Sequence, residues 1–568
     1  MEIQTLRTRR MGKKRQKCYL RMGIKMTSVA INKSLTEIYK FLFQNYSKDE
    51  IHIVSNELQQ IVEHNPTDYS IVPVGRTYED IQRFLSTVNE KESIRKSNGV
   101  YYTANDVVRF IYSNAIKSLY GNLKANNLHV QDLNGIPYKS FSYEKTVFDP
   151  TCGAGEFLLV ALSIKLDLID LHQEEVTTKD IIKVAKTIYG NDINNDSVMI
   201  TKLRLLIYVL NRYGADRVVG LASQFESRFG CYDFINLDKS YSNKYDIIIG
   251  NPPYVEDAKC DTEPLEKYGN VYANVLANVS QCLSPNGVIG FIIPLSYVST
   301  PRMLKIREVL STKLCEQYIL SYCDRPDCLF PSVHQKLCIL IGKQNETVVS
   351  KRYYTGNYQF WYKEERDGLF TTVPAVLNKY VTEECIPKIG TTVDSSIYRK
   401  VTTRSHTLAS LLGGEKTPIY LNMRAAFWIK AFRNEHTSGE YKTFLCSSEE
   451  DADLCMCLLN SSLFWWYWIC VSDCWHITNK ELRGFTVPKI EDYSKIRQLA
   501  KKLEQRLEET KVYVGTKQTE YEYKHKECTA VIHEIDDVIC DVFGLTAEEK
   551  IHIKNFAYKY RVSGGKKK

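Results

Sequence analysis

The stretch TVFDPTCGAGEFLLVAL, residues 146–162, combines three local patterns that together decide the fold class. Its first residues are mostly β-branched or aromatic and predict a short buried strand. Gly153 and Gly155 follow in a turn, where glycine lets the backbone approach a ligand closely. The apolar run from Phe157 predicts a helix. The stretch is therefore a strand, loop and helix unit of the kind that opens an α/β sheet.

The same alternation continues from about residue 96 to 345, where short apolar runs are separated by amphipathic stretches. Strands alternating with helices are typical of a mainly parallel, doubly wound sheet, whose ligands bind at the carboxyl ends of the strands. The predicted strands are KTVFDP (145–150), TIYGNDI (187–193), YDIIIGN (245–251), GVIGFIIP (287–294), EQYILSY (316–322) and KLCILIG (336–342).

Three further segments flank this predicted α/β sheet. Residues 26–95 have helical periodicity and predict an N-terminal helical segment. Residues 346–495 are rich in Tyr, Trp and Thr and predict a separate mixed domain. Residues 496–568 predict two long charged helices and a basic end, with IHEIDDVICDVFGL as the apolar-striped helix. These helices could pair with a second copy of the chain or brace the mixed domain, and we expect a brace.

The formal net charge of +8 comes entirely from residues 1–25, which hold nine Lys or Arg and one acid, so that 9 minus 1 is +8. The remaining residues sum to zero, and any attraction for nucleic acid must come from local patches. We expect the head to be disordered. This head is either a tail that binds DNA or the product of an upstream start codon. The second possibility arises because the sequence from Met26 resembles an ordinary protein N-terminus.

Composition favours a cytoplasmic protein with no membrane span and no metal. No apolar run approaches the ~18 residues of a span. The seventeen cysteines are scattered and lack the spacing of zinc knuckles, so we expect reduced, buried thiols.

The glycine loop excludes two phosphate-binding motifs. A dinucleotide fingerprint needs a third glycine at position 158, which is Leu158, and no Lys-Ser/Thr pair follows for a P-loop. A nucleoside without such phosphates remains. Asp192, after the next strand, is placed to accept ribose hydroxyls, and Asp233 with Phe234 offers an acceptor and a flat surface for adenine. This order predicts an S-adenosyl-L-methionine pocket.

The strand YDIIIG ends on Asn251, Pro252, Pro253 and Tyr254, an unusual way to leave a strand. One reaction that such a strand end could serve is methylation of the exocyclic amine of adenine. This amine is a poor nucleophile, because its lone pair is delocalised into the ring. The Asn251 amide oxygen and the Pro252 carbonyl can accept its two hydrogens, and proline fixes φ and removes a competing donor. Tyr254 supplies a face on which a base flipped out of the duplex can stack. These four residues are the predicted catalytic site.

At these residues the chain resembles gamma-class adenine-N6 DNA methyltransferases of the restriction-modification type. GVYYTANDVVRFI (99–111) is similar to the family's leading motif, FDPTCGAGEF (148–157) to its first cofactor motif and NPPY to its catalytic motif. The resemblance implies a Rossmann-like S-adenosylmethionine-dependent sheet followed by a target-recognition domain. The implied cofactor residues in the first two motifs are Tyr101, Thr103, Asp149, Thr151, Cys152, Gly153 and Gly155. One departure is the interval of 37 positions between Gly155 and Asp192.

The resemblance also implies double-stranded DNA as the substrate. We expect any restriction endonuclease to be a separate protein and the chain to act as a monomer. PIYLNMRAAFWIKAF (418–432) and residues 459–488 are similar to recognition-domain segments. We expect most of FWWYW (464–468) to lie in the core. His476, Asn479 and Lys480 in the following polar segment are the predicted DNA contacts, to phosphate rather than to bases.

Three kinds of alternative stay open. An Asn-Pro-Pro-Tyr site also suits a protein glutamine, a guanine amine in RNA or the N4 of cytosine. A bifunctional enzyme that also cuts DNA needs a nuclease site, and the segment before Gly99 has no clear set of its acids. A non-catalytic DNA-binding subunit is disfavoured because every chemical element of the site is present. A cytosine-C5 enzyme, in contrast, is excluded because no Pro-Cys dipeptide occurs.

Overall fold

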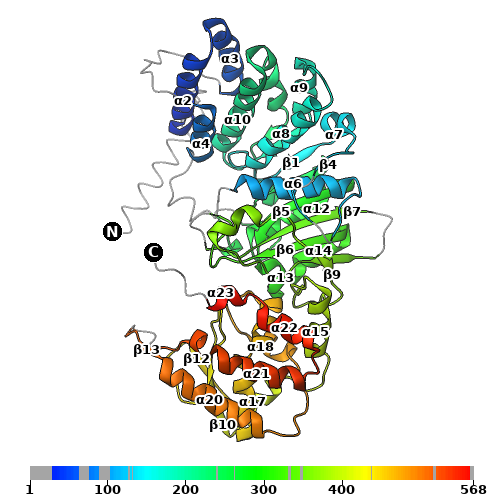
Figure 1. The fold of residues 1–568 in the computed structure, drawn as a ribbon. Helices are drawn as coiled ribbons and strands as arrows, with labels where there is room; N and C mark the ends of the chain where they lie inside the picture. Colours follow the sequence, from blue (N-terminus) through cyan, green and yellow to red (C-terminus); the bar gives the residue numbers. More distant parts are fainter. Residues whose placement is uncertain are drawn as a thin grey trace. The chain divides into compact units, whose positions relative to one another are not determined.

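The computed structural model describes the chain in two compact units, each built on its own set of strands (Figure 1). The first unit contains the described residues of 1–98 and 137–234, and the second those of 99–136 and 235–568. The structure describes residues 28–62, 76–88, 103–125, 128–130, 132–237, 241–260, 263–330, 334–345, 350–436, 438–515 and 520–562. The predicted basic head and Tyr101 therefore lie outside the described residues.

The first unit has three parallel strands in the order β3-β2-β1, alternating with helices as predicted. β1 and β2 lie inside the predicted strands, whereas β3 is a two-residue strand that the sequence did not indicate. The strands are β1 Val147–Asp149, β2 Ile188–Asn191 and β3 Phe229–Gly230. The helices are α2 Val29–Asn45, α3 Lys48–Ile61, α4 Tyr78–Thr87, α7 Tyr138–Glu144, α8 Glu156–Asp170, α9 Thr178–Ala185, α10 Asn195–Tyr213 and α11 Leu221–Glu226.

The N-terminal helices pack against α10 and α11 of this unit. α3 begins with a capping box between Ser47 and Glu50, so its first N–H groups are satisfied locally. Glu57 on α3 is buried, and its carboxylate accepts from the N–H groups of Gly220 and Ala222 at 2.7 and 2.8 Å. These N–H groups start α11, where a carboxylate also complements the helix dipole. The helical segment predicted for residues 26–95 thus belongs to the first unit, which also contains the predicted cofactor motif.

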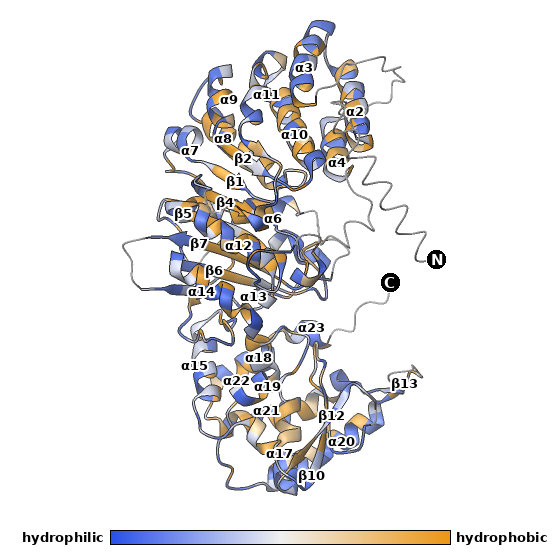
Figure 2. Cartoon of the chain, turned by 180° about the vertical axis from the view of Figure 1, so that it is seen from behind, coloured by the Kyte–Doolittle hydropathy of each residue, from blue (hydrophilic) through white to orange (hydrophobic). Residues whose placement is uncertain are grey.

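The second unit contains a six-strand arrangement in the order β4-β5-β7-β6-β8-β9. β4, β5, β6 and β8 run in one direction, and β7 and β9 run in the other. The strands in the middle of this arrangement are mainly orange in Figure 2, which agrees with their burial. Their bounds are β4 Tyr245–Gly250, β5 Leu283–Pro294, β6 Leu314–Tyr322, β7 Leu337–Gln344, β8 Arg352–Thr355 and β9 Val376–Leu377.

Helix α6 (Asn105–Leu119) packs across β4, β5 and β7. Its close approach requires glycine on β5, because a Cβ at Gly290 would lie 2.8 Å from Ile111 Cγ2 on α6. At the N-terminal end of α6, Asp106 forms a two-pronged ion pair with Arg366, with distances of 2.7 and 2.9 Å. The helix that follows the predicted leading motif is therefore held tightly on the strand layer. The other helices beside these strands are α12 Val271–Cys282, α13 Ser296–Ser299 and α14 Leu304–Lys313.

The rest of the second unit is the predicted mixed region. It has a small antiparallel sheet in the order β11-β10-β12, with helices against it. α18 is buried along its whole length, including every aromatic residue of FWWYW, which confirms the expected core role of this segment. The elements are α15 Thr392–Thr402, α16 Leu408–Leu411, β10 Thr417–Asn422, β11 Ala431–Phe432, β12 Tyr441–Cys446, α17 Glu449–Asn460, α18 Ser462–Val471 and α19 Asn479–Gly484.

The C-terminal helices brace this region, as expected. Arg561 on the last helix is buried, with its guanidinium 4.1 Å from the ring centroid of Trp428 and 4.3 Å from that of Trp465. It also donates to Phe427 O and Ser462 Oγ. The elements are α20 Ser494–Thr510, β13 Val512–Tyr513, β14 Tyr521–Glu522, α21 Thr529–Val542, α22 Ala547–Asn555 and α23 Tyr558–Val562.

Over the described ranges, a single helix with the length and apolarity to cross a membrane is not found. Only α17 and α18 taken together reach that length and apolarity, as a pair bent by 63°. The described cysteines are all free thiols, and fourteen of these sixteen are buried.

Candidate active site

The glycine loop after β1 adopts a backbone that only glycine accommodates easily. Gly153 has φ +52° and Gly155 has φ +83°, both in the left-handed region. A Cβ at Gly155 would lie 2.6 Å from Thr201 Cγ2, so this position is also sterically closed. A Cβ at Gly153 would meet nothing within 4 Å. The loop is thus tight on its α10 side and open beside Gly153.

Two side chains of α10 hold this loop in place, and the sequence interpretation missed both. Thr201 Oγ1 donates to Gly153 O at 2.9 Å, and Arg204 Nη1 donates to Ala154 O at 2.6 Å. Arg204 also pairs with Glu156 at 2.6 Å. Gln82 on α4 accepts from Arg204 Nε at 2.9 Å, which links the N-terminal helices to the loop. No local sequence signal identifies these contacts, because they join segments far apart in the chain.

Asp192 closes the same loop from the end of β2. Its Oδ2 accepts from Gly153 N at 2.9 Å and its Oδ1 from Asn194 N at 2.9 Å. Burial raises the pKa of Asp192, and these two N–H groups oppose that rise. The helices α8 and α9 account for the long interval between Gly155 and Asp192, and the chain still returns Asp192 to the glycine loop.

Asp149 at the end of β1 is 1% exposed, and burial raises its pKa to about 8, with a further contribution from Asp192. Its Oδ1 accepts from Thr151 N at 3.0 Å. Thr151 Oγ1 is buried and has no hydrogen-bond partner among the described residues. The Cys152 side chain is buried with its Sγ 3.9 Å from Thr201 Oγ1, so it packs inward.

Asn191, the last residue of β2, ties the other predicted cofactor segment to the glycine loop. Its Nδ2 donates to Pro150 O at 3.1 Å and to Tyr232 O at 3.0 Å, and its Oδ1 accepts from Tyr232 N at 3.1 Å. Asp233 and Phe234 follow directly, and the Phe234 ring lies 5.8 Å from that of Phe148 on β1. The first unit therefore brings the predicted residues 149–155, 192 and 233–234 together at the ends of its strands.

The four predicted catalytic residues, Asn251–Tyr254, follow β4 directly in the second unit and form the predicted catalytic tip. Asn251 Nδ2 donates to Thr103 Oγ1 at 3.0 Å, and Thr103 is 3% exposed. Because Nδ2 is the donor in this bond, the orientation of the Asn251 amide is fixed. The amide oxygen Oδ1 is then the hydrogen-bond acceptor on the other side of the group. Thr103 was predicted as a cofactor contact, and the structure pairs it with Asn251, the predicted catalytic asparagine. α6 begins two residues later and is held on the strands by the Asp106–Arg366 pair.

The rest of the tip is fixed by contacts to neighbouring strands and helices. Pro252 is buried and Pro253 is half-buried. Tyr254 OH donates to Ile292 O on β5 at 3.0 Å, which anchors its ring. Asp257 accepts from Gly269 N and from Asn274 Nδ2, both at 2.7 Å, and so closes the loop that follows the tip.

The three predicted DNA contacts differ in their exposure to solvent. His476 is exposed, with Nδ1 3.0 Å from Asp473 Oδ2, and Asn479 is exposed at the start of α19. Lys480 is 9% exposed and donates to Ser299 O and Val471 O, both at 2.7 Å, while pairing with Glu481 at 3.1 Å. These acceptors hold its ammonium inside the protein. The predicted phosphate contact by Lys480 was therefore wrong.

Comparison with known proteins shows which family part of this chain resembles. Residues 186–326 match the Eco57I restriction-modification methylase family. This match includes Asp192, Asp233, Phe234 and the Asn251–Tyr254 tip. This part of the chain is thus similar to a restriction-modification methylase domain, and S-adenosyl-L-methionine is the cofactor that such a domain implies.

A curated relative from Methanocaldococcus jannaschii, "Putative type II restriction enzyme and methyltransferase RM.MjaORFECS2P", is 26% identical over 211 residues. The match covers 32% of this chain and 16% of the relative, so the chain spans well under two thirds of that protein.

Among solved structures, the Type IIL restriction-modification enzyme MmeI in complex with DNA has a TM-score of 0.50 at 13% identity, over 85% of this chain and 81% of that chain. The Type ISP enzyme LlaBIII bound to DNA has a TM-score of 0.46 at 14% identity, over 84% of this chain and 45% of that one. The likeness to MmeI is one of fold, and it confirms the predicted α/β methyltransferase architecture.

The residues of the first unit fit the implied cofactor. A nucleoside needs backbone that can be approached closely, which the open side of Gly153 offers. It also needs polar groups at the strand ends, and the buried Thr151 hydroxyl, Asp192 and Asp233 supply them. Thr151, Gly153, Asp192, Asp233 and Phe234 are the residues that would hold it.

Proposed function

We propose that this protein transfers a methyl group from S-adenosyl-L-methionine to the N6 amine of adenine in duplex DNA, at a specific sequence. The observation that carries the proposal is the end of β4, where the Asn251 amide is oriented by Thr103 and followed by the proline pair. The methylase family match and the residues that fit the cofactor support the same reaction.

The chemistry proposed for the tip is positioning and polarisation. Asn251 Oδ1 and the Pro252 carbonyl each accept one hydrogen of the amine, which draws the nitrogen toward tetrahedral geometry and directs its lone pair outward. The two prolines keep the backbone rigid and offer no competing donor. The cofactor, when bound, supplies the electrophilic methyl group. No covalent bond to the protein is needed, so preorganisation of acceptors carries the rate enhancement.

Tyr254 is proposed to stack on the flipped base. Its hydroxyl is anchored on Ile292 O, so the ring is held before the base arrives. Flipping costs a few kcal/mol of lost stacking and pairing, which an aromatic face in part replaces. A planar base therefore suits this tip better than a flexible protein glutamine does.

The partners follow from this proposal. The region predicted as residues 346–495 would recognise the DNA sequence, with His476 and Asn479 as exposed contacts. Any restriction endonuclease would be a separate protein, and the site of action would be the cytoplasmic DNA of the host.

The test is expression in a host that lacks DNA methylation, followed by modification-sensitive genome sequencing. We expect one sequence motif to carry N6-methyladenine with the wild-type protein and no modified motif with Asn251→Ala. Tyr254→Phe is the matched control, because it keeps the ring and loses only the bond to Ile292; it should retain methylation where Tyr254→Ala loses most of it. Unmodified DNA together with robust transfer to RNA or to a protein glutamine would refute the DNA substrate, and N4-methylcytosine would refute the adenine assignment.

A further inference from the structure

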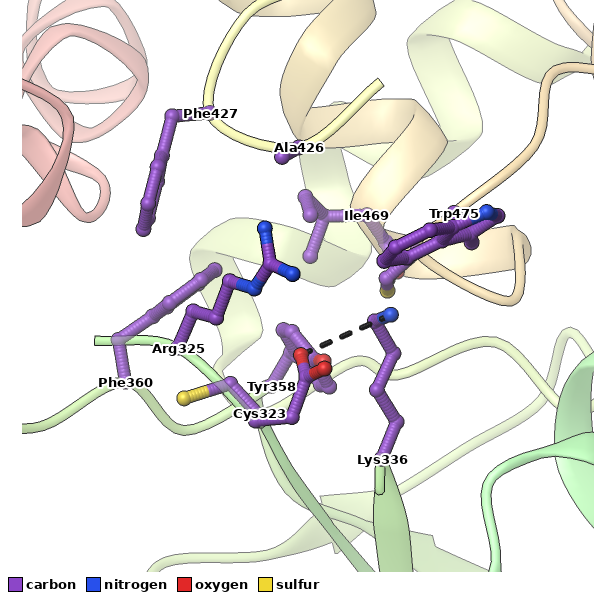
Figure 3. A pocket seen from close by; sticks show the side chains of 11 residues that line it. Cys323, Arg325, Lys336, Tyr358, Phe360, Ala426, Phe427, Ile469 and Trp475 are labelled. Carbon is purple, nitrogen blue, oxygen red and sulfur yellow. Dashed lines mark hydrogen bonds and ion pairs between the residues drawn. The ribbon is translucent and has the colours of Figure 1, made fainter. Parts of the chain in front are cut away.

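The second unit contains a pocket outside the catalytic tip, lined by aromatic and basic side chains (Figure 3). Arg325 and Lys336 come from the connection between β6 and β7, and Trp475 from the segment between α18 and α19. Phe360 lies between β8 and β9, and Phe427 between β10 and β11. Strand ends of the methylase part and loops of the mixed region thus build one pocket.

This pocket lies at the same edge of the strand layer as Asn251. β4, β5 and β6 are parallel, so the residues that follow them, among them Asn251 and Arg325, emerge at one edge. β6 is three strand positions from β4 in the order β4-β5-β7-β6. At roughly 4.8 Å per position, the two strand ends are about 14 Å apart. A DNA strand advances about 3.4 Å per base pair, so this separation corresponds to about four steps.

The cations of the pocket face an aromatic ring and are only partly neutralised. Lys336 Nζ lies 4.4 Å from the Trp475 ring centroid and 3.6 Å from Asp324 Oδ1. The Arg325 guanidinium lies 5.6 Å from the same centroid. Arg325 is exposed and forms no ion pair with any of the residues that the structure describes. One positive charge therefore stays uncompensated beside the ring, which favours an anionic ligand.

Two aromatic walls flank this charge. In Figure 3, Phe360 and Phe427 lie on one side of the Arg325 guanidinium and Trp475 on the other. The Phe360 and Phe427 ring centroids are 6.1 Å apart. Tyr358 is buried in the lining, and burial raises its pKa well above the usual range, so its hydroxyl is neutral at physiological pH. A ligand with both a negative charge and a flat ring matches these walls.

We infer that the pocket binds one nucleotide of the DNA substrate, about four steps from the target adenine. Its phosphate would be held by Arg325 and Lys336, and its base would stack on Trp475 or on the Phe360 and Phe427 rings. A charged groove with aromatic stacking faces is the usual way to bind an unstacked nucleotide. The inference rests on the proposed DNA substrate, and it adds a second contact that positions the strand beside the catalytic tip.

Photo-crosslinking tests the position directly. Once the methylated motif is known, duplexes each carry a single 5-iodouracil at one of the positions two to seven nucleotides from the target adenine, and the full-length protein is irradiated with each. We expect cross-links to Trp475, Phe360 or Phe427, found by peptide mass spectrometry, to peak about four nucleotides away. Cross-links only to residues outside the pocket would overturn the inference.

Kinetic and binding measurements are the second test of the inference. Arg325→Gln with Lys336→Gln should raise KM for DNA about tenfold. It should also make the salt dependence of binding less steep by about one charge, because the variant no longer neutralises that one phosphate. The kcat at saturating DNA and the Kd for S-adenosylmethionine should not change. Arg483→Gln is the control, because Arg483 is exposed and paired with Glu384 outside the pocket.

The two proposals fail in distinguishable ways. If the wild-type protein methylates no DNA, the proposed function fails and the pocket loses its ligand. If it methylates DNA while the double variant keeps the wild-type KM and salt dependence, only the pocket inference fails. The melting temperature of each variant shows whether the variant is folded. Trp475→Phe keeps an aromatic ring in place and should retain most of the DNA affinity that Trp475→Ala loses. Equal affinity in these two variants would overturn stacking of the base on Trp475.

Discussion

The amide of Asn251 donates to the hydroxyl of Thr103 at 3.0 Å, joining the tip of β4 to the residue just before α6, 148 positions earlier in the chain. Because Asn251 is the proposed acceptor for the substrate amine, we infer that Thr103 is a positioning residue rather than the cofactor contact implied by its motif.

Thr103→Val keeps the side-chain shape and removes the oxygen that orients Asn251. We expect kcat for methyl transfer to fall about tenfold to a hundredfold, as small misplacements of reacting groups do. The Kd for S-adenosylmethionine, measured by calorimetry, should stay within about twofold of the wild type. Thr103→Ser restores the hydroxyl and should recover most of kcat. A weakened cofactor Kd with unchanged kcat would instead leave Thr103 as a cofactor contact alone.

Gly155→Ala should destabilise the first unit more than Gly153→Ala does. Both positions have positive φ, which costs about 1–2 kcal/mol for a residue with a Cβ. At Gly155 the new methyl also meets Thr201 Cγ2 at 2.6 Å, whereas at Gly153 it meets nothing within 4 Å. Chemical denaturation measures the difference. Adding Thr201→Ser, which removes that methyl and keeps the hydroxyl, should recover part of the loss only in the Gly155 variant.

The stability of the ligand-free protein should fall as pH rises from about 5 to about 8. The folded-state pKa of Asp149 is about 8 because the group is buried, whereas the unfolded value is about 3.9. Between these values the folded state binds more protons than the unfolded state, so raising the pH favours unfolding, and the effect levels off above pH 8. Asp149→Asn keeps the acceptor for Thr151 N and should remove this part of the slope in urea unfolding between pH 5 and 9. Parallel curves for the two proteins would contradict the assignment.

Lys480→Ala should lower stability rather than weaken DNA binding. The substitution leaves two buried carbonyls and Glu481 without their cation, which costs about 3 kcal/mol or more. The exposed neighbour Asn479 is the control, and Asn479→Ala should change the unfolding free energy by less than about 0.5 kcal/mol. A stable Lys480→Ala protein with a reduced salt dependence of DNA binding would show that Lys480 does bind phosphate.

The strands of the methylase part were predictable because each is a short apolar run bounded by turn residues. β4, with three isoleucines before Asn251, lies inside its predicted range, and β5 starts four residues before its predicted one. The two-residue β3 was missed because so short a strand has no periodicity to detect. The small sheet β11-β10-β12 was missed for a related reason: its strands are held by neighbours rather than by a local pattern.

Lys480 shows where local composition misleads. It sits in a polar run, SDCWHITNK, that resembles an exposed loop, yet the fold turns its side chain inward to the carbonyls of Ser299 and Val471. Ser299 is 181 positions away, and no window of sequence contains that information.

The sequence by itself determined the chemistry of this protein: which residues offer acceptors, which glycines permit a left-handed backbone and in what order the motifs occur. These properties belong to single residues and their immediate neighbours. The tertiary structure alone decided that Thr103 orients Asn251, that Thr201 and Arg204 hold the glycine loop, and that Arg325 and Lys336 share a pocket with Trp475. Such contacts join distant segments, and they form only when the burial of apolar strands and helices brings those segments together.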